Sequence, residues 1–197
     1  MKTLVGLQEY LDQHYHRSVF EEAVADAADR VLHVHGGEIL VARIVENTPY
    51  DIGILPSGEK QGGGSEPLTM PKLDVKLVYP AEIKEKVAKR LKNDAKVEKL
   101  QLAPSLSARD RHHIKNKSLY PLMKERVVVF FTLLGGEIVR GLIAAFSRYE
   151  ITVNLKGGVP VTILRHAVYD LRDKKGNCYL KSVQQKTRDW EKSPLFQ

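Results

Sequence analysis

Short apolar segments separated by turn residues dominate the later part of this chain. The apolar run at 127–134 ends at Gly135 and Gly136, and similar segments follow at 138–146, 149–155, 159–164 and 167–171. This pattern is typical of short β-strands joined by tight turns. Gly141 in the second segment indicates a bend or bulge, since glycine weakens a straight strand. We therefore expect a small, bent antiparallel sheet of about five strands.

Helical patterns precede this sheet and occupy much of the earlier chain. Leu119 and Leu122 are spaced to pack a short helix at 118–126 against the sheet. Ser18 followed by Glu21 has the form of a capping box, which predicts a helix at about 18–29. Amphipathic spacing also predicts helices at 4–15 and, surrounded by lysines, at 81–100.

The sequence repeats itself at an offset of about one hundred residues. Gly36–Ile39 recurs as Gly135–Ile138, Tyr50 aligns with Tyr149, and an acidic residue follows the tyrosine in each copy. Each copy also ends in an apolar, strand-like segment, at 73–79 and 159–171. The simplest interpretation is two copies of one small β-rich domain.

The repeat and the breaks between apolar segments divide the chain into five parts. They are an N-terminal helical extension at 1–17, a first domain at 18–80, a basic helical linker at 81–117, a second domain at 118–172 and a C-terminal tail at 173–197. Within the first domain, the glycine-rich stretch between Pro56 and Pro67 predicts a flexible loop.

The second copy resembles the bacterial Sm-like RNA chaperone Hfq family over residues 118–171. The resemblance is carried by Leu119–Val129, by Gly141, by the Phe-Ser-Arg-Tyr turn at 146–149 and by Arg165-His166-Ala167-Val168. The first copy, at 20–79, is more diverged: it keeps Tyr50 but has Lys72-Leu73 where the second copy has Arg165-His166.

This resemblance implies a mainly β fold with helices. Each of two tandem Sm-like domains would be an N-terminal helix on a bent five-stranded antiparallel sheet, and the basic helical linker would join them. Such a sheet has two unpaired edges, and joining edges head to tail closes a ring. With two copies per chain, three chains would form a pseudo-sixfold ring, so we expect a homo-oligomer.

The resemblance also implies a binding site for single-stranded, uridine-rich RNA at the pore of the ring. Tyr149 would stack on a base, Arg165 would contact phosphate and His166 would reach the sugar or base edge. Tyr149 and His166 also have ordinary structural interpretations, Tyr149 as a strand tyrosine and His166 as a structural histidine.

Two further groups of candidate RNA-binding residues follow from the same resemblance. Lys124 and Arg126 stand where the family has a basic rim, although the alternative is a solvated charged helix face. Tyr50 and Lys72 are the weaker candidates of the first copy, which we expect to be mainly a structural segment of the ring.

Charge is distributed unevenly along the chain. Residues 1–80 hold 7 Lys and Arg against 12 Asp and Glu, whereas 81–118 hold 11 against 5 and 119–197 hold 13 against 7. A polyanionic partner such as nucleic acid is therefore expected to meet the later part of the chain.

Other classes of function find little support in the sequence. No nucleophile triad, phosphate-binding glycine loop or paired-carboxylate motif is recognisable, so we expect no enzyme and no cofactor. The pairs His14/His16 and His33/His35 have no third ligand at a suitable spacing, and the single Cys178 offers no disulfide. No apolar run is long enough to span a bilayer, and we expect a cytoplasmic protein with no membrane partner.

Two hypotheses for function remain. The first is a noncatalytic RNA-binding protein that acts as an RNA chaperone in post-transcriptional regulation, and Tyr149, Arg165 and His166 favour it. The second is a protein-interaction scaffold that has lost RNA binding, whose basic linker and tail dock an acidic protein partner. The acidic first copy favours the scaffold, as does the absence of the family's purine site at Thr132 and Leu133.

Overall fold

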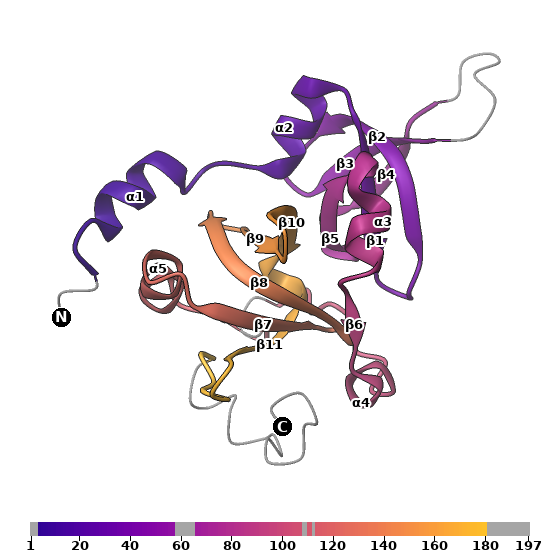
Figure 1. The fold of residues 1–197 in the computed structure, drawn as a ribbon. Helices are drawn as coiled ribbons and strands as arrows, with labels where there is room; N and C mark the ends of the chain where they lie inside the picture. The colour runs from indigo at the N-terminus through magenta and orange to yellow at the C-terminus, as the bar shows by residue number, and fades with distance from the viewer. Residues whose placement is uncertain (1–3, 58–65, 108–109, 112, 181–197) are drawn as a thin grey trace.

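The structure is a computed structural model that describes residues 4–57, 66–107, 110–111 and 113–180 (Figure 1). Most of the expected loop at 56–67 and most of the tail at 173–197 lie outside the described residues. The α-helices are α1 (Leu7–His14), α2 (Val19–Asp26), α3 (Lys84–Ala88), α4 (Ala95–Glu98) and α5 (Asn116–Lys124). Short 3-10 helices are η2 (Lys72–Asp74), η3 (Ala81–Ile83) and η4 (Arg165–Ala167).

The strands of the earlier chain are β1 (Asp29–Val34), β2 (Ile39–Asn47), β3 (Asp51–Pro56), β4 (Leu68–Pro71) and β5 (Val75–Pro80). The two-residue β6 (Lys92–Asn93) follows. The strands of the later chain are β7 (Val128–Leu133), β8 (Glu137–Phe146), β9 (Glu150–Leu155), β10 (Val159–Leu164) and β11 (Val168–Asp173). The five strands of the later chain lie where the apolar segments predict them.

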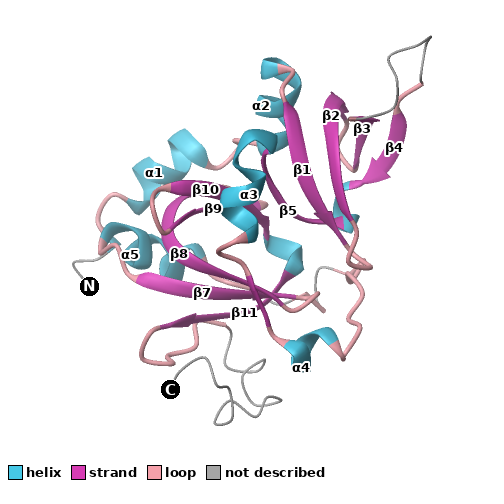
Figure 2. Ribbon diagram, turned by 45° about the vertical axis from the view of Figure 1, so that its right-hand side comes forward, coloured by secondary structure: helices cyan, strands magenta, loops and turns pink. Residues whose placement is uncertain are grey.

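The eleven strands form one continuous antiparallel sheet, so the expected architecture of two tandem Sm-like domains with separate five-stranded sheets is wrong. The strand order is β11-β7-β8-β9-β10-β5-β1-β2-β3-β4, with β6 paired to β8 outside this path. The first half (18–80) and the second half (118–173) meet where β5 pairs with β10, through Val78 opposite Thr162 and Leu77 opposite Ile163. Figure 2 shows the sheet curving from β11 and β7 to β4.

The physical reason for this correction is the pairing of strand edges. A sheet edge left open exposes unpaired backbone groups, and the sequence pattern does not say which edge covers which. In this chain the last strand of the first half and the fourth strand of the second half cover each other within one molecule. Within each half the order is the same, because the last strand lies beside the first, so the sequence repeat corresponds to a repeated strand order.

The hydrophobic cores also cross the boundary between the halves. The larger core is formed mainly by the second half and α5, yet it includes Val31, Leu77 and Tyr79 from β1 and β5. The smaller core packs α2 onto the first half, and it includes Leu164 from β10. Each half thus completes the core of the other, as expected for one folding unit rather than two.

Helices α2 and α5 precede the strands of their halves as expected, whereas the linker differs from the prediction. Ser18 caps α2 by accepting a hydrogen bond from the backbone N–H of Phe20, and α5 buries Leu119 and Leu122. The expected single helix at 81–100 is wrong: η3, α3, β6 and α4 replace it. The chain leaves the helix at 92–93 because these residues pair with Ile138 and Glu137 of β8, and Asp94 then caps α4.

Gly141 lies where β8 approaches β9 closely, whereas the irregularity in the pairing of these strands lies between Ile143 and Ala145 rather than at Gly141. A Cβ at this position would clash with the carbonyl oxygen of Asn154 and lie 2.7 Å from Cγ1 of Val153. Since backbone atoms cannot move aside cheaply, only glycine fits without a shift of β9.

We expect Gly141→Ala to lower the free energy of unfolding by about 1–3 kcal/mol through overcrowding. The measurement is urea denaturation followed by circular dichroism. Ala144→Val, at an exposed position of the same strand, serves as the control and is expected to change stability by less than about 0.5 kcal/mol. Equal stability of Gly141→Ala and the parent would contradict the close approach of β8 and β9.

Candidate nucleic-acid interface

Tyr149 lies in the turn between β8 and β9 and presents its ring to solvent. The turn is closed by the backbone N–H of Ser147, which donates to the carbonyl oxygen of Glu150 at 2.9 Å. The side chain of Tyr149 is 60% exposed, and the guanidinium of Arg148 lies 5.0 Å from its ring centroid. An exposed aromatic ring beside a cation is suited to stacking on an unpaired base.

Tyr50 occupies the equivalent turn of the first half, between β2 and β3. Here the N–H of Thr48 donates to the carbonyl oxygen of Asp51 at 3.0 Å, and the tyrosine is 82% exposed. The carbonyl oxygen of each tyrosine accepts a backbone hydrogen bond from a matching residue, Lys72 at 2.9 Å for Tyr50 and Arg165 at 2.8 Å for Tyr149. The repeat therefore produces two exposed tyrosines with the same backbone environment.

The side chain of Arg165 does not line an open surface together with Tyr149. Its guanidinium donates to the side-chain oxygen of Asn116 at 3.0 Å and to the carbonyl oxygen of Ile114 at 3.4 Å, and it lies 5.6 Å from the ring of Phe146. Nε of Arg165 is buried without a hydrogen-bond partner in the described structure. Burial lowers the pKa of this group to about 10.

Helix α1 covers the region around Arg165. The hydroxyl of Tyr10 donates to the carbonyl oxygen of Phe146 at 3.0 Å and accepts from its N–H at 2.7 Å, while the two rings lie 4.7 Å apart. The backbone N–H of Arg148 donates to the carbonyl oxygen of Tyr15 at 2.9 Å. The N-terminal helix is thus tied to the end of β8 and to the turn of Tyr149 (Figure 1).

His166 points toward the first half rather than toward Tyr149. Its Nε2 lies 3.0 Å from the carbonyl oxygen of Val75, at the start of β5. A carbonyl oxygen can only accept, so this nitrogen carries the proton. Burial lowers the pKa of His166 to about 4, which keeps the ring neutral at physiological pH. This histidine acts as a link between the two halves.

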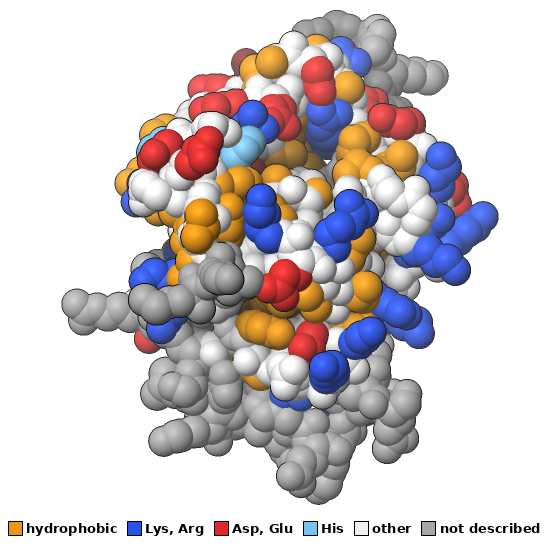
Figure 3. Space-filling model, turned by 60° about the vertical axis from the view of Figure 1, so that its left-hand side comes forward, with side chains coloured by type: hydrophobic (Ala, Val, Ile, Leu, Met, Phe, Trp, Pro, Cys, Tyr) orange, Lys and Arg blue, Asp and Glu red, His pale blue; other side chains and the backbone are white. Residues whose placement is uncertain are grey.

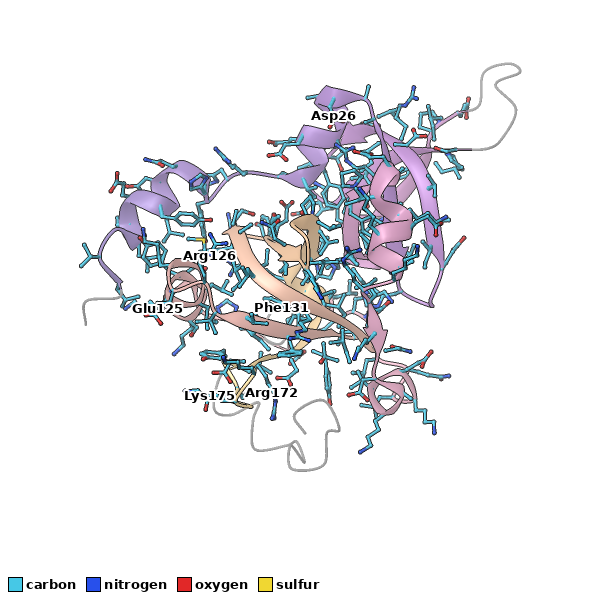
Figure 4. The ribbon with its side chains drawn as sticks, in the orientation of Figure 1. Asp26, Glu125, Arg126, Phe131, Arg172 and Lys175 are labelled. Atoms are coloured by element: carbon cyan, nitrogen blue, oxygen red, sulfur yellow. The ribbon has the colours of Figure 1, made fainter. Side chains whose placement is uncertain are left out.

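The remaining candidates lie apart from the turn of Tyr149. Lys72 donates to the carbonyl oxygen of Thr48 and lies 5.5 Å from the ring of Phe20, and burial lowers its pKa. Lys124 lies 5.8 Å from the ring of Tyr120, and Tyr120 in turn lies beside Tyr10 of α1. The exposed Arg126 follows the end of α5 (Figure 4). The rim candidates therefore belong to α5 and the residues that follow it, and not to the turn of Tyr149.

Glu150 is a residue of this region whose role the sequence did not indicate. It is 8% exposed, and its carboxylate accepts from the N–H of Val19 at 2.8 Å and from the hydroxyl of Ser18 at 3.2 Å. It therefore joins the second half to the start of α2. Burial raises the pKa of Glu150 to about 7, although the hydrogen bonds from α2 oppose the shift.

Sequence reasoning also missed Arg148 and Tyr10. The signal for Glu150 was visible as the acid that follows each tyrosine of the repeat, but its partners on α2 are 131 and 132 residues away. Arg148 stood within the quoted Phe-Ser-Arg-Tyr turn. Nothing in the sequence predicts the contact of Tyr10 with Phe146, because the two residues are 136 positions apart and Tyr10 lies outside both copies.

Buried polar groups also gather where the halves meet. Lys76 of β5 forms an ion pair with Glu137 of β8, and Nε2 of His33 lies 2.9 Å from the hydroxyl of Tyr79. Burial lowers the pKa of His33 and of His35 to about 4. Among the described residues, no group of three or more His, Cys, Asp or Glu side chains is placed to hold a metal ion.

Comparison with known proteins identifies no relative of this chain. No family model, curated protein or solved structure matches this chain. The resemblance to the Sm-like family therefore depends only on the residues that carry it in the sequence. Across the part of the chain that the structure describes, no helix has the length and apolar character needed to cross a membrane.

The buried titratable groups make stability depend on pH in two opposing ways. The pKa of His33, His35 and His166 lies near 4 in the folded state, below the ordinary 6.5, so their contribution to stability is lost as the pH falls from about 6.5 to 4. The pKa of Glu150 is raised from 4.5 to about 7, so its contribution is present at low pH and lost as the pH rises to 7. We expect the parent protein to lose stability on acidification, partly offset by Glu150.

Glu150→Gln separates these two effects, because its amide oxygen can accept from the N–H of Val19 and its amide nitrogen can donate to the hydroxyl of Ser18, but it cannot ionise. We expect it to raise the free energy of unfolding at pH 8 by about 1–3 kcal/mol and to steepen the loss of stability on acidification. The measurement is urea denaturation at several pH values, with Glu9→Gln on the exposed side of α1 as the control. A Glu150→Gln variant that is less stable than the parent at pH 8 would show that the carboxylate is stabilised in its charged form.

Proposed function

We propose that this protein binds single-stranded, uridine-rich RNA and that unpaired bases stack on Tyr149. The observation that carries the proposal is the exposed ring of Tyr149 beside the guanidinium of Arg148, in a chain of net charge +7. Folding normally removes large aromatic rings from water, so a ring that is 60% exposed at a fixed turn offers a surface for a ligand. The cation beside it attracts phosphate and strengthens stacking.

Tyr50 offers a second, weaker stacking surface in the same proposal. It is more exposed than Tyr149 and has the same backbone environment, but the first half is acidic. Lys72, its matching basic residue, donates to the carbonyl oxygen of Thr48 and lies near acidic groups, with Glu150, Glu21 and Asp51 acting on its pKa. Phosphate is therefore attracted less strongly here than at Tyr149.

In this proposal Arg165 positions the turn of Tyr149, and His166 links the two halves. The N–H of Arg165 holds the carbonyl oxygen of Tyr149, and His166 holds the start of β5. Direct contact of Arg165 with phosphate would require α1 to leave the end of β8, since its guanidinium is bonded to Asn116 beneath that helix. We accordingly assign base stacking to Tyr149 and the main attraction of phosphate to Arg148.

We expect Tyr149→Ala to weaken binding of oligouridine by about 5- to 150-fold, since each stacked base contributes about 1–3 kcal/mol. Tyr149→Phe keeps the ring and is expected to retain most of the affinity. The measurement is fluorescence anisotropy of labelled oligouridine at two salt concentrations, with oligoadenine for comparison.

Tyr50→Ala is the matched control for position, because it removes an exposed tyrosine from the equivalent turn. We expect a smaller loss than for Tyr149→Ala. Undiminished binding by a folded Tyr149→Ala variant would refute the proposal. The absence of RNA binding by the parent, together with capture of an acidic polypeptide, would favour the scaffold function.

The proposal includes self-association through the two outer strands of the sheet, β4 and β11. The outer side of β11 is partly covered, because the N–H of Tyr179 donates to the carbonyl oxygen of Leu171 at 3.0 Å. The backbone of Cys178 also forms an isolated antiparallel β-bridge with that of Arg172. The outer side of β4 has no partner strand within the described sheet. Unpaired strand edges favour association with a further chain.

We expect light scattering on the purified protein to give a homo-oligomer rather than a monomer, because an unpaired outer strand favours pairing with another chain. Thr69→Pro, in the middle of β4, would remove a backbone donor from this strand and is expected to lower the mass of the oligomer. Leu100→Ser, in an exposed position away from the sheet edges, is the control. A parent protein that stays monomeric at micromolar concentration contradicts assembly through these edges.

A further inference from the structure

The segment that joins the two halves carries a concentration of positive charge that the site at Tyr149 does not use. Residues 84–99 hold seven Lys and Arg against three Asp and Glu. Two of the three acids have structural roles: Asp94 accepts from the N–H of Lys96, and Glu98 accepts from the side-chain amide of Asn93. The lysines of the segment remain largely exposed, whereas its apolar residues Val87, Leu91 and Val97 are buried or half-buried.

Arg90 attaches this segment to the turn between β9 and β10. Its Nε donates to the carbonyl oxygen of Lys156 at 2.7 Å, and its Nη1 donates to the carbonyl oxygen of Lys86. Two residues later, Lys92 of β6 pairs with Ile138 of β8. The segment therefore lies against the same ends of β8 and β9 that carry Arg140 and Lys156.

These elements together form what we call the basic surface. It consists of six cationic residues from the linker, β8 and the turn after β9: Lys86, Lys89, Arg90, Lys92, Arg140 and Lys156. Five of the six are exposed, and none of the six forms an ion pair within the part of the chain that the structure describes. Lys and Arg side chains gather on one side of the view in Figure 3, whereas acidic side chains gather over its upper part.

Strand β9 connects the basic surface to Tyr149. Tyr149 immediately precedes the strand and Lys156 immediately follows it, so the two lie roughly 23 Å apart along an extended backbone. Thr152 and Asn154 alternate with the buried Ile151, Val153 and Leu155, which places these two half-buried polar residues on the face away from the core. This distance corresponds to about seven nucleotides at the 3.4 Å spacing of a stacked strand.

We propose that the basic surface binds the phosphate backbone of the same RNA strand whose base stacks on Tyr149. This inference rests on the proposed function and adds a second contact, which an RNA of about seven stacked nucleotides reaches and one of about three nucleotides does not. Uncompensated lysines and arginines from several elements suit a flexible chain of phosphates, because each phosphate needs a cation but no fixed geometry. None of the six residues of the basic surface is aromatic, and the ring nearest to Arg140, that of Phe130 at 5.4 Å, is half-buried.

The test is a triple variant, Lys89→Gln, Lys92→Gln and Lys156→Gln, which removes three exposed charges from the basic surface. The matched control is Lys117→Gln, Lys174→Gln and Lys175→Gln, which removes the same charge from exposed positions elsewhere. Both are titrated with oligouridine of about 3 and about 24 nucleotides, at about 50 and about 200 mM salt, after thermal melting has confirmed that each variant is folded.

We expect the triple variant to bind the short RNA as the parent does and to lose affinity only for the long one. Binding of the long RNA by the triple variant should release about two fewer counterions than binding by the parent. Raising the salt over this range should therefore weaken the binding of the parent about 20-fold more than that of the variant. The control should resemble the parent. Equal effects of the two triple variants would overturn the proposal, because total charge alone would then explain binding.

Two further outcomes separate this inference from the proposed function. If Tyr149→Ala binds the short RNA as well as the parent does while the basic-surface variant still loses the long RNA, the stacking site fails and the basic surface stands. If polyglutamate competes with the long RNA as strongly as unlabelled RNA of equal charge does, the surface accepts any polyanion and its assignment to RNA is overturned.

Discussion

The pairing of β5 with β10 is the interaction on which the rest of this structure depends. Two residue pairs join the halves in one sheet, and the contacts around them extend that junction: Lys76 with Glu137, His166 with Val75, and Glu150 with the start of α2. Each of these contacts buries a polar group that needs its partner, because an unpaired buried charge or donor is costly. The junction is therefore held by specific geometry rather than by apolar area alone.

This junction also decides which candidate residues are accessible. His166 is used to hold β5, and Arg165 is enclosed beneath α1, so the basic pair that the sequence suggested for RNA is mostly occupied by structural contacts. Tyr149 remains exposed because it lies in a turn, where the backbone is satisfied locally and the ring has no core to enter. The same reasoning applies to Tyr50, so exposure follows from the turn rather than from the half that contains it.

The linker contributes a strand, core contacts and positive charge to the molecule. Its residues add β6 to β8, cover the face of β1 and β5 with Val87, and bring a series of lysines to the end of β9. Acidic helices α1 and α2 lie over another part of the surface. The charge asymmetry along the sequence thus becomes an asymmetry in space, with one side suited to a polyanion and the other not.

The sequence by itself determined the local elements and the repeat. Apolar segments ending at Gly135 and Gly136 predicted the strands of the second half, the hydroxyl of Ser18 predicted the start of α2, and the alignment of Tyr50 with Tyr149 predicted two equivalent turns. Strand pairing between the halves was decided only by tertiary structure, because an open edge can pair within a chain or between chains and its sequence is the same in both cases. The burial of Arg165 and the role of Glu150 were likewise decided there, since their partners lie at least 49 residues away and no periodic pattern connects them.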